Sequence, residues 1–151
     1  MLLYRLTRCV YANDLTGAGA RLYGGRWNSE GKGMLYLASS RALAVLEALV
    51  HLPPANIPDE YCMVEIETPD DFIDVDQKLL PPNWNNADEL DILKQFGNSF
   101  LFEKKSLMLK VPSAIVDMEY NYLLNPAHKS AQKVKVKKIR SFTFDNRLIN
   151  E

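Results

Sequence analysis

The sequence has few of the residues on which most recognisable catalytic and metal sites depend. Its 151 residues include two cysteines and two histidines, and their spacing fits neither a zinc site nor a Cys–His nucleophilic pair. Cys9 and Cys62 lie in apolar, strand-like stretches, so we expect buried, reduced thiols in a cytoplasmic protein. His51 and His128 have no metal-ligand spacing around them, and no metal site is predicted.

Long apolar runs and a large excess of one charge are also missing. No stretch approaches the roughly 20 apolar residues that cross a bilayer, and we expect no secretory signal because the N-terminal segment lacks its apolar core. The net charge of -1 argues against a general nucleic-acid-binding protein. Acidic residues concentrate in 59–91 and basic residues in 129–147, which we interpret as two solvated faces.

The pattern of apolar residues predicts a single α+β domain over residues 1–151. Most predicted strands follow one another without a helical crossover, which argues against a doubly wound sheet. Ser39 or Ser40 is expected to cap the first helix. The expected strands cover 2–10, 34–38, 61–67 (half-buried), 71–76, 107–111, 113–118 (after a kink) and 134–144; the helices cover about 40–51 and 88–96, the second ended by Gly97; 12–33 is a long loop and 81–84 a turn.

Six of the seven glycines lie between Gly17 and Gly33, which suggests a loop that approaches a phosphate. The two standard nucleotide motifs are nevertheless absent. Leu22 occupies the position where a dinucleotide fingerprint needs its last glycine, and no Lys-Ser or Lys-Thr pair follows the Walker-like glycines. The glycines alone therefore fit a tightly turned surface loop as well as they fit a phosphate site.

Arg26 within this loop, together with Tyr36 and Glu47 after it, begins to define a candidate site. Arg26 is suited to bidentate phosphate binding, although on its own it is better explained as a surface arginine paired with one of the many acids. Glu47 lies on the apolar stripe of the predicted helix, where a carboxylate is costly unless it is paired or used. Tyr36 lies in an apolar run and has core packing as its default role. Ser113 and Asn121 fit structural roles at a kinked strand and near a turn.

Three segments together resemble the RES domain family: GGRWNSEGKGMLYLASSRALAVLEALVHL from residue 24, LKVPSAIVDMEYNYLLNP from residue 109, and FTFDNRL from residue 142. The family is named for an arginine, a glutamate and a serine, which match Arg26, Glu47 and Ser113. The resemblance covers nearly the whole chain and is weakest over 68–105.

The resemblance implies an ADP-ribosyltransferase-like fold, a bent and split mixed sheet with a few flanking helices and a cleft for NAD⁺. RES proteins are toxins of bacterial toxin–antitoxin systems. Characterised members hydrolyse or phosphorolyse NAD⁺, and some ADP-ribosylate a protein. The implied partner is an antitoxin with an Xre-like helix-turn-helix part that covers the active site. Neither direct nucleic-acid binding nor membrane attachment is implied.

The chemistry of NAD⁺ agrees with a single carboxylate. Nicotinamide leaves as a neutral molecule, so the second carboxyl group that glycosidases use as an acid is not required. Glu47 would stabilise the oxocarbenium-like ribose and position the acceptor. Arg26 would hold the pyrophosphate, Tyr36 would pack on the nicotinamide ring, and Ser113 would orient Glu47 or the ribose. The remaining candidates for contact with NAD⁺ are Arg5, Tyr23, Trp27, Asn28 and Asn121.

Several alternatives stay open on the sequence alone. A protein ADP-ribosyltransferase would use the same scaffold and the same NAD⁺. A non-catalytic binding module would pair Arg26 with Glu47 in a buried ion pair. Nucleic-acid binding through 129–140 is a more distant alternative. Neither the acceptor, whether water, phosphate or a protein side chain, nor the oligomeric state follows from the residues.

Overall fold

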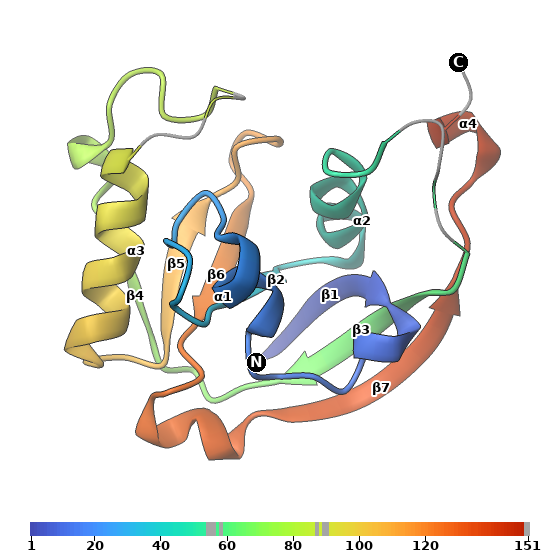
Figure 1. The fold of residues 1–151 in the computed structure, drawn as a ribbon, viewed down its shortest axis with the longest axis horizontal. Coiled ribbons are helices and arrows are strands. Elements are labelled where there is room, and N and C mark those ends of the chain that lie inside the picture. The colour runs from blue at the N-terminus through green and yellow to red at the C-terminus, as the bar shows by residue number, and fades with distance from the viewer. Residues whose placement is uncertain (54–56, 58, 87, 89–90, 150–151) are drawn as a thin grey trace.

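The computed structural model describes residues 1–53, 57, 59–86, 88 and 91–149. Within them the chain forms one seven-stranded mixed sheet with helices packed along it (Figure 1). The sheet order is β4-β5-β6-β2-β1-β3-β7, with β4 and β5 parallel and the other pairs antiparallel. The strands are β1 Leu2–Arg8, β2 Leu35–Ala38, β3 Tyr61–Glu67, β4 Phe72–Asp74, β5 Met108–Pro112, β6 Tyr120–Leu124 and β7 Lys135–Phe142; the helices are α1 Ala18–Tyr23, α2 Arg41–Leu49, α3 Asp91–Glu103 and α4 Asn146–Ile149.

The sheet is divided at the junction of β1 and β2. These two strands pair at a single position, Tyr4 with Ala38, whereas β1 pairs with β3 along its whole length. One half of the sheet therefore contains β1, β3 and β7, and the other contains β2, β6, β5 and β4. The two halves turn away from each other (Figure 1). The predicted fold class, α+β with a bent and split mixed sheet, is confirmed.

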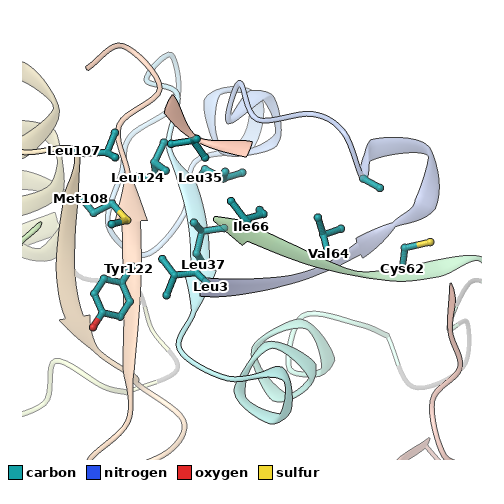
Figure 2. Packing of buried hydrophobic residues seen from close by; sticks show 12 residues of the cluster. Leu3, Leu35, Leu37, Cys62, Val64, Ile66, Leu107, Met108, Tyr122 and Leu124 are labelled. Atoms are coloured by element: carbon teal, nitrogen blue, oxygen red, sulfur yellow. The ribbon is translucent and has the colours of Figure 1, made fainter. Parts of the chain in front are cut away.

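Buried apolar side chains join the two halves of the sheet below this junction. Leu3 of β1, Leu35 and Leu37 of β2, and Ile66 of β3 are almost fully buried and belong to one cluster (Figure 2). A second cluster packs α3 on β5 and β6, and a third packs α2 on β1 and β3. Each half therefore has its own covering helix, while a shared core holds the halves together.

Helix α2 forms as its sequence pattern predicts. Ser40 adopts an extended conformation at the N-cap, and its side chain accepts a hydrogen bond from the Leu43 amide at 3.1 Å, which satisfies one of the free donors of the first turn. Leu43 and Ala44 are buried against the sheet. Among the described residues, no helix is long and apolar enough to cross a membrane.

Two predicted segments differ in the structure: part of the predicted loop is a helix, and a predicted strand is a turn. The segment 12–33 is not a loop throughout, since helix α1 forms after Gly17, which adopts a positive φ at the N-cap. The segment 113–118 does not extend the sheet. The Ser113 hydroxyl accepts hydrogen bonds from the amides of Ile115 and Val116, both at 3.1 Å, and these bonds fix a turn between β5 and β6.

Two further expectations are wrong because of long-range packing. Strand β3 is buried on both faces except at its last residue. One face packs in the core cluster shared by the two half-sheets, and α2 covers the other. Helix α3 does not end at Gly97 but continues to Glu103. Its predicted start at Asp88 is followed by residues 89–90, which lie outside the described part of the chain. Gly97 is buried inside this helix, against the Trp27 backbone.

The two cysteines form a disulfide, so the prediction of reduced thiols is wrong. Cys9 follows the last residue of β1, and Cys62 pairs with Thr7 across β1 and β3. This neighbouring position brings their Cα atoms to 4.9 Å, within the usual range for a bridge. The two cysteines are 53 residues apart in the sequence, and no local pattern indicates that they are in contact.

We expect the Cys9→Ser, Cys62→Ser double variant to lose about 3 kcal/mol of unfolding free energy, because the bridge restricts a long loop of the unfolded chain. Urea unfolding monitored by circular dichroism measures this loss. The urea unfolding curve of wild-type protein in reducing buffer should coincide with that of the double variant. Coincident curves for oxidised wild type and the double variant would contradict the expectation.

Candidate active site

Two adjoining cavities lie beside the junction of the two half-sheets, with volumes of about 530 and 490 Å³. Both volumes fall within the range of small-molecule sites. The two cavities share five lining residues, four from four different elements and one from the turn after α2, which places these residues where the cavities meet. The shared residues are Ala20, Tyr36, Glu47, His51 and Asn121.

The larger cavity lies between the glycine loop and the turn that follows β5. Arg26 and Trp27 contribute from the loop, and Val50 contributes from the end of α2. Ala114 and Ile115 contribute from the turn after β5. This cavity therefore combines a cation with a largely apolar wall.

The smaller cavity occupies the place where β1 and β2 separate. Residues 4–7 of β1 and 35–38 of β2 face it from the two sides. Ala44 and Ala48 of α2 also line it, and their small side chains leave room beside the helix. The split in the sheet thus supplies the space that the smaller cavity fills.

Glu47 is held by two hydrogen bonds from the opposite half of the sheet. Ser113 Oγ donates to Glu47 Oε1 at 2.8 Å, and Asn121 Nδ2 donates to the same oxygen at 2.6 Å. Ser113 follows β5 and Asn121 lies on β6. A carboxylate that accepts two hydrogen bonds is held in one orientation. The structure therefore brings together the glutamate and the serine singled out in the sequence, and adds Asn121 to them.

Tyr36 is fixed at the cavity wall by a network below it. Its hydroxyl accepts a hydrogen bond from the Trp27 amide at 3.1 Å and donates to Asn28 Oδ1 at 2.6 Å. Asn28 is fully buried and also donates to the carbonyls of Ala20 and Lys32. Asn28 is therefore not on the cavity wall, where we expected it to contact NAD⁺. Its place is beneath the wall, where it orders the glycine loop around Tyr36.

Arg26 is held by backbone carbonyls rather than by an acid. Its Nη1 donates to the carbonyls of Trp84 and Asn86, both at 3.0 Å. Among the described residues no carboxylate forms an ion pair with Arg26. Because the carbonyls orient the guanidinium without neutralising it, the charge at the cavity wall can still attract an anion.

Helix α3 supports the loop that carries Arg26. The Ser29 amide donates to Asn98 Oδ1 at 3.1 Å, and Asn98 Nδ2 donates to Ser29 Oγ at 2.8 Å. Asn98 of α3 thus both accepts a hydrogen bond from the loop and donates one to it. Beside this pair, Gly97 lets the helix approach the Trp27 carbonyl closely.

The remaining candidates divide between the wall and the outside. Arg5 lines the smaller cavity and donates to the Asp14 carbonyl at 2.7 Å. Burial lowers the pKa of the Arg5 guanidinium, and the Asp14 charge opposes that shift. Tyr23 is 81% exposed and does not line either cavity, although we expected it at the cleft.

His51 is the lining residue that the sequence reasoning set aside. It lines both cavities from the turn that follows α2, four residues after Glu47. In the helix predicted over 40–51, this spacing would place the two side chains on neighbouring parts of one surface. The signal was present, but we tested the histidines only for metal-ligand spacing. Among the described residues, no group of three or more His, Cys, Asp or Glu side chains is placed to hold a metal ion.

Comparison with known proteins identifies the family. The model of the RES domain matches residues 2–145. This chain belongs to the RES domain family. Within it the chain is 42% identical over 151 residues to "Toxin Res" of Yersinia enterocolitica, covering 98% of this chain and 99% of the relative.

Another RES relative carries a more specific name. The "Prs ADP-ribosylating toxin" of Sphingobium sp. (strain YBL2) is 40% identical over 148 residues, covering 95% of this chain and 92% of the relative. Among solved structures, a chain of the M. tuberculosis MbcT–MbcA toxin–antitoxin complex superimposes with a TM-score of 0.76, covering 94% of this chain and 84% of that chain. Their identity is 20%, so this likeness concerns the fold alone.

Proposed function

We propose that this RES domain is a toxin that consumes NAD⁺ by cleaving the bond between nicotinamide and ribose. The observation that supports this most strongly is the Glu47 carboxylate, oriented by Ser113 and Asn121 where two cavities meet. The names of the relatives point in the same direction, since they are toxins and one is an ADP-ribosylating toxin.

The two cavities match the parts of NAD⁺, which is two nucleosides joined by a pyrophosphate. Arg26 lines the larger cavity with a charge that no carboxylate neutralises among the described residues, and a guanidinium binds phosphate oxygens well. Tyr36 presents an aromatic ring where the cavities meet and suits the flat nicotinamide. We assign the pyrophosphate to Arg26 and the nicotinamide end to Tyr36.

Glu47 then acts on the ribose. When the C1′–N bond breaks, its electron pair passes to the pyridinium nitrogen and nicotinamide leaves neutral, so positive charge develops on the ribose. A fixed carboxylate stabilises that charge without reorganising. The acceptor oxygen then attacks C1′ and forms the new C–O bond, and when the acceptor is water its proton passes to the solvent. Ser113 and Asn121 contribute as donors that keep Glu47 in place.

Transfer of ADP-ribose to a protein is the second candidate. It is favoured by the name of the Sphingobium relative, which is described as ADP-ribosylating. The cleavage step would be the same, with a protein side chain in place of water or phosphate. The site is compatible with both, since one carboxylate serves either acceptor.

A non-catalytic module built on an Arg26–Glu47 ion pair is contradicted by the geometry. Arg26 donates to the carbonyls of Trp84 and Asn86, while Glu47 accepts from Ser113 and Asn121. The two charged groups have separate partners.

We propose an antitoxin as the partner that controls this site. The structural neighbour comes from a toxin–antitoxin complex. Val50, which is 57% exposed, and Ile115 are apolar residues at the edge of the larger cavity. Exposed apolar residues beside a cavity suit a protein that closes it. We assign the antitoxin an Xre-like helix-turn-helix part on the basis of the family resemblance.

Replacing Arg26 with lysine should raise the KM for NAD⁺ by on the order of tenfold, because an ammonium replaces the planar fork that binds phosphate oxygens. Initial rates over a range of NAD⁺ concentrations measure this. Arg21→Lys, an exposed change on α1 outside both cavities, is the matched control. An unchanged KM in Arg26→Lys would remove Arg26 from the substrate site.

Product identification tests the proposed function and separates its versions. Antitoxin-free protein is incubated with NAD⁺, with and without inorganic phosphate, and with cell extract. Free ADP-ribose indicates hydrolysis, and its 1″-phosphate indicates phosphorolysis. A protein that carries the ADP-ribose group indicates ADP-ribosyl transfer. Intact NAD⁺ under all three conditions would refute the proposal.

A further inference from the structure

Helix α2 crosses the split in the sheet and is bound to both halves. It packs against both β1 and β2. Glu47 binds Ser113 and Asn121 in the half that contains β5 and β6. At the start of the helix, Arg41 binds Glu65 on β3, in the other half. The helix that carries the carboxylate is therefore fixed by polar contacts in both halves: Glu47 in one and Arg41 in the other.

The two contacts face different directions from the helix. Arg41 and Glu47 are six residues apart, which corresponds to about 9 Å along the axis and about 120° around it. A helix with polar contacts on two faces, one near its start and one near its end, resists both sliding and rotation. Loss of either contact leaves the helix anchored on one side.

The Arg41 contact has a specific geometry on the β1–β3 half. Its guanidinium lies 4.6 Å from the ring centre of Tyr4, and Tyr4 is the residue through which β1 pairs with β2. The Glu65 side chain is 9% exposed, so a partner is needed to keep its charge there. The hydrogen bond from Arg41 is the main cause that lowers the pKa of Glu65, with smaller contributions from Arg140 and Lys138 of β7.

We infer that Arg41 is a positioning residue for the reaction, acting through α2 to place the Glu47 carboxylate. Its contact with Glu65 and Tyr4 sets where the helix lies relative to β1. Glu47 then meets Ser113 and Asn121 at the junction of the cavities. Arg41 itself lines neither cavity, so we assign its effect on the reaction to the helix rather than to contact with the substrate. This inference rests on the proposed function of Glu47.

The test replaces Arg41 with methionine, which keeps an unbranched apolar stem and removes the charge. We expect kcat for NAD⁺ to fall by on the order of 100-fold, as small displacements of a catalytic group do, while KM changes much less. Arg41→Lys, which keeps a charge for Glu65, should recover much of kcat. The matched control is Lys137→Met, which removes the exposed ion pair with Glu67 between β7 and β3 and leaves α2 untouched.

A second measurement does not depend on turnover. The side-chain amide of Asn121 donates to Glu47, so its NMR resonance reports this hydrogen bond directly. It should shift in Arg41→Met and stay unchanged in Lys137→Met. If Arg41→Met does not fold, Glu65→Gln removes the same charge pair from the other side and should give the same kcat and NMR changes to a smaller degree.

The outcomes separate this inference from the proposed function. Wild-type activity in folded Arg41→Met, or an unshifted Asn121 resonance, overturns the inference while leaving the proposed function intact. Equal changes of kcat and KM in both Arg41→Met and Lys137→Met also overturn it, since they indicate general loosening of the sheet. A wild-type protein that leaves NAD⁺ intact refutes the proposed function, and the Asn121 resonance then still decides whether Arg41 places Glu47.

Discussion

Replacing Glu47 with glutamine should lower the rate of NAD⁺ consumption by on the order of 1,000-fold, the cost of removing a central electrostatic group from an active site. The glutamine keeps an oxygen that can accept from Ser113 and Asn121, which now bind Glu47 Oε1. The helix should therefore stay in place, and the melting temperature should change little. What is lost is the negative charge beside the developing cation on the ribose.

The control for this prediction is Glu103→Gln. Glu103 is the last residue of α3 and forms an exposed ion pair with Lys105, away from both cavities. It removes the same charge and should leave the rate at the wild-type value. Assays of nicotinamide release on the three proteins make the comparison. Wild-type turnover by Glu47→Gln would show that another group stabilises the ribose.

Replacing Gly97 with alanine should cost more than about 4 kcal/mol of unfolding free energy, in the exceptional range for one substitution. A Cβ at this position would overlap the carbonyl oxygen of Trp27. The obstacle is backbone, so no side-chain rotation relieves it, and α3 has to move away from the glycine loop. Arg26 lies next to Trp27, so the KM for NAD⁺ should rise in any protein that still folds.

The matched control is Gly19→Ala, because Gly19 is also a helical glycine, in α1. A Cβ there meets nothing within 4 Å, and alanine is the better helix former. Gly19→Ala should be as stable as wild type or slightly more stable. Chemical unfolding of the three proteins measures the difference. A Gly97→Ala protein with wild-type stability would show that α3 and the loop are not closely packed.

The parts of the molecule that the sequence predicts are those determined by local patterns. Helix α2 could be predicted because Ser40 caps its start and the apolar stripe lies within it. Arg26, Glu47 and Ser113 could be named because the family resemblance points to them, and the structure joins Ser113 to Glu47. The split in the sheet also follows from that resemblance.

The predictions that were wrong or missing concern features that depend on contacts between distant segments. Gly97 resembles a helix stop, and only the approach of Trp27 explains a glycine inside α3. Cys9 and Cys62 are joined because β1 and β3 pair in one register. Arg26 finds its carbonyl partners in 84–86, a segment in which the family resemblance is weakest. No local pattern encodes these partners.

The most direct test of the account is nicotinamide release by the purified, antitoxin-free protein. NAD⁺ is added in large excess, and nicotinamide is quantified over time by chromatography, with Glu47→Gln and Glu103→Gln measured in parallel. We predict one nicotinamide for each NAD⁺ consumed by wild type and Glu103→Gln, and almost none from Glu47→Gln. NAD⁺ that stays intact with folded wild-type protein, or equal release by Glu47→Gln, would contradict it.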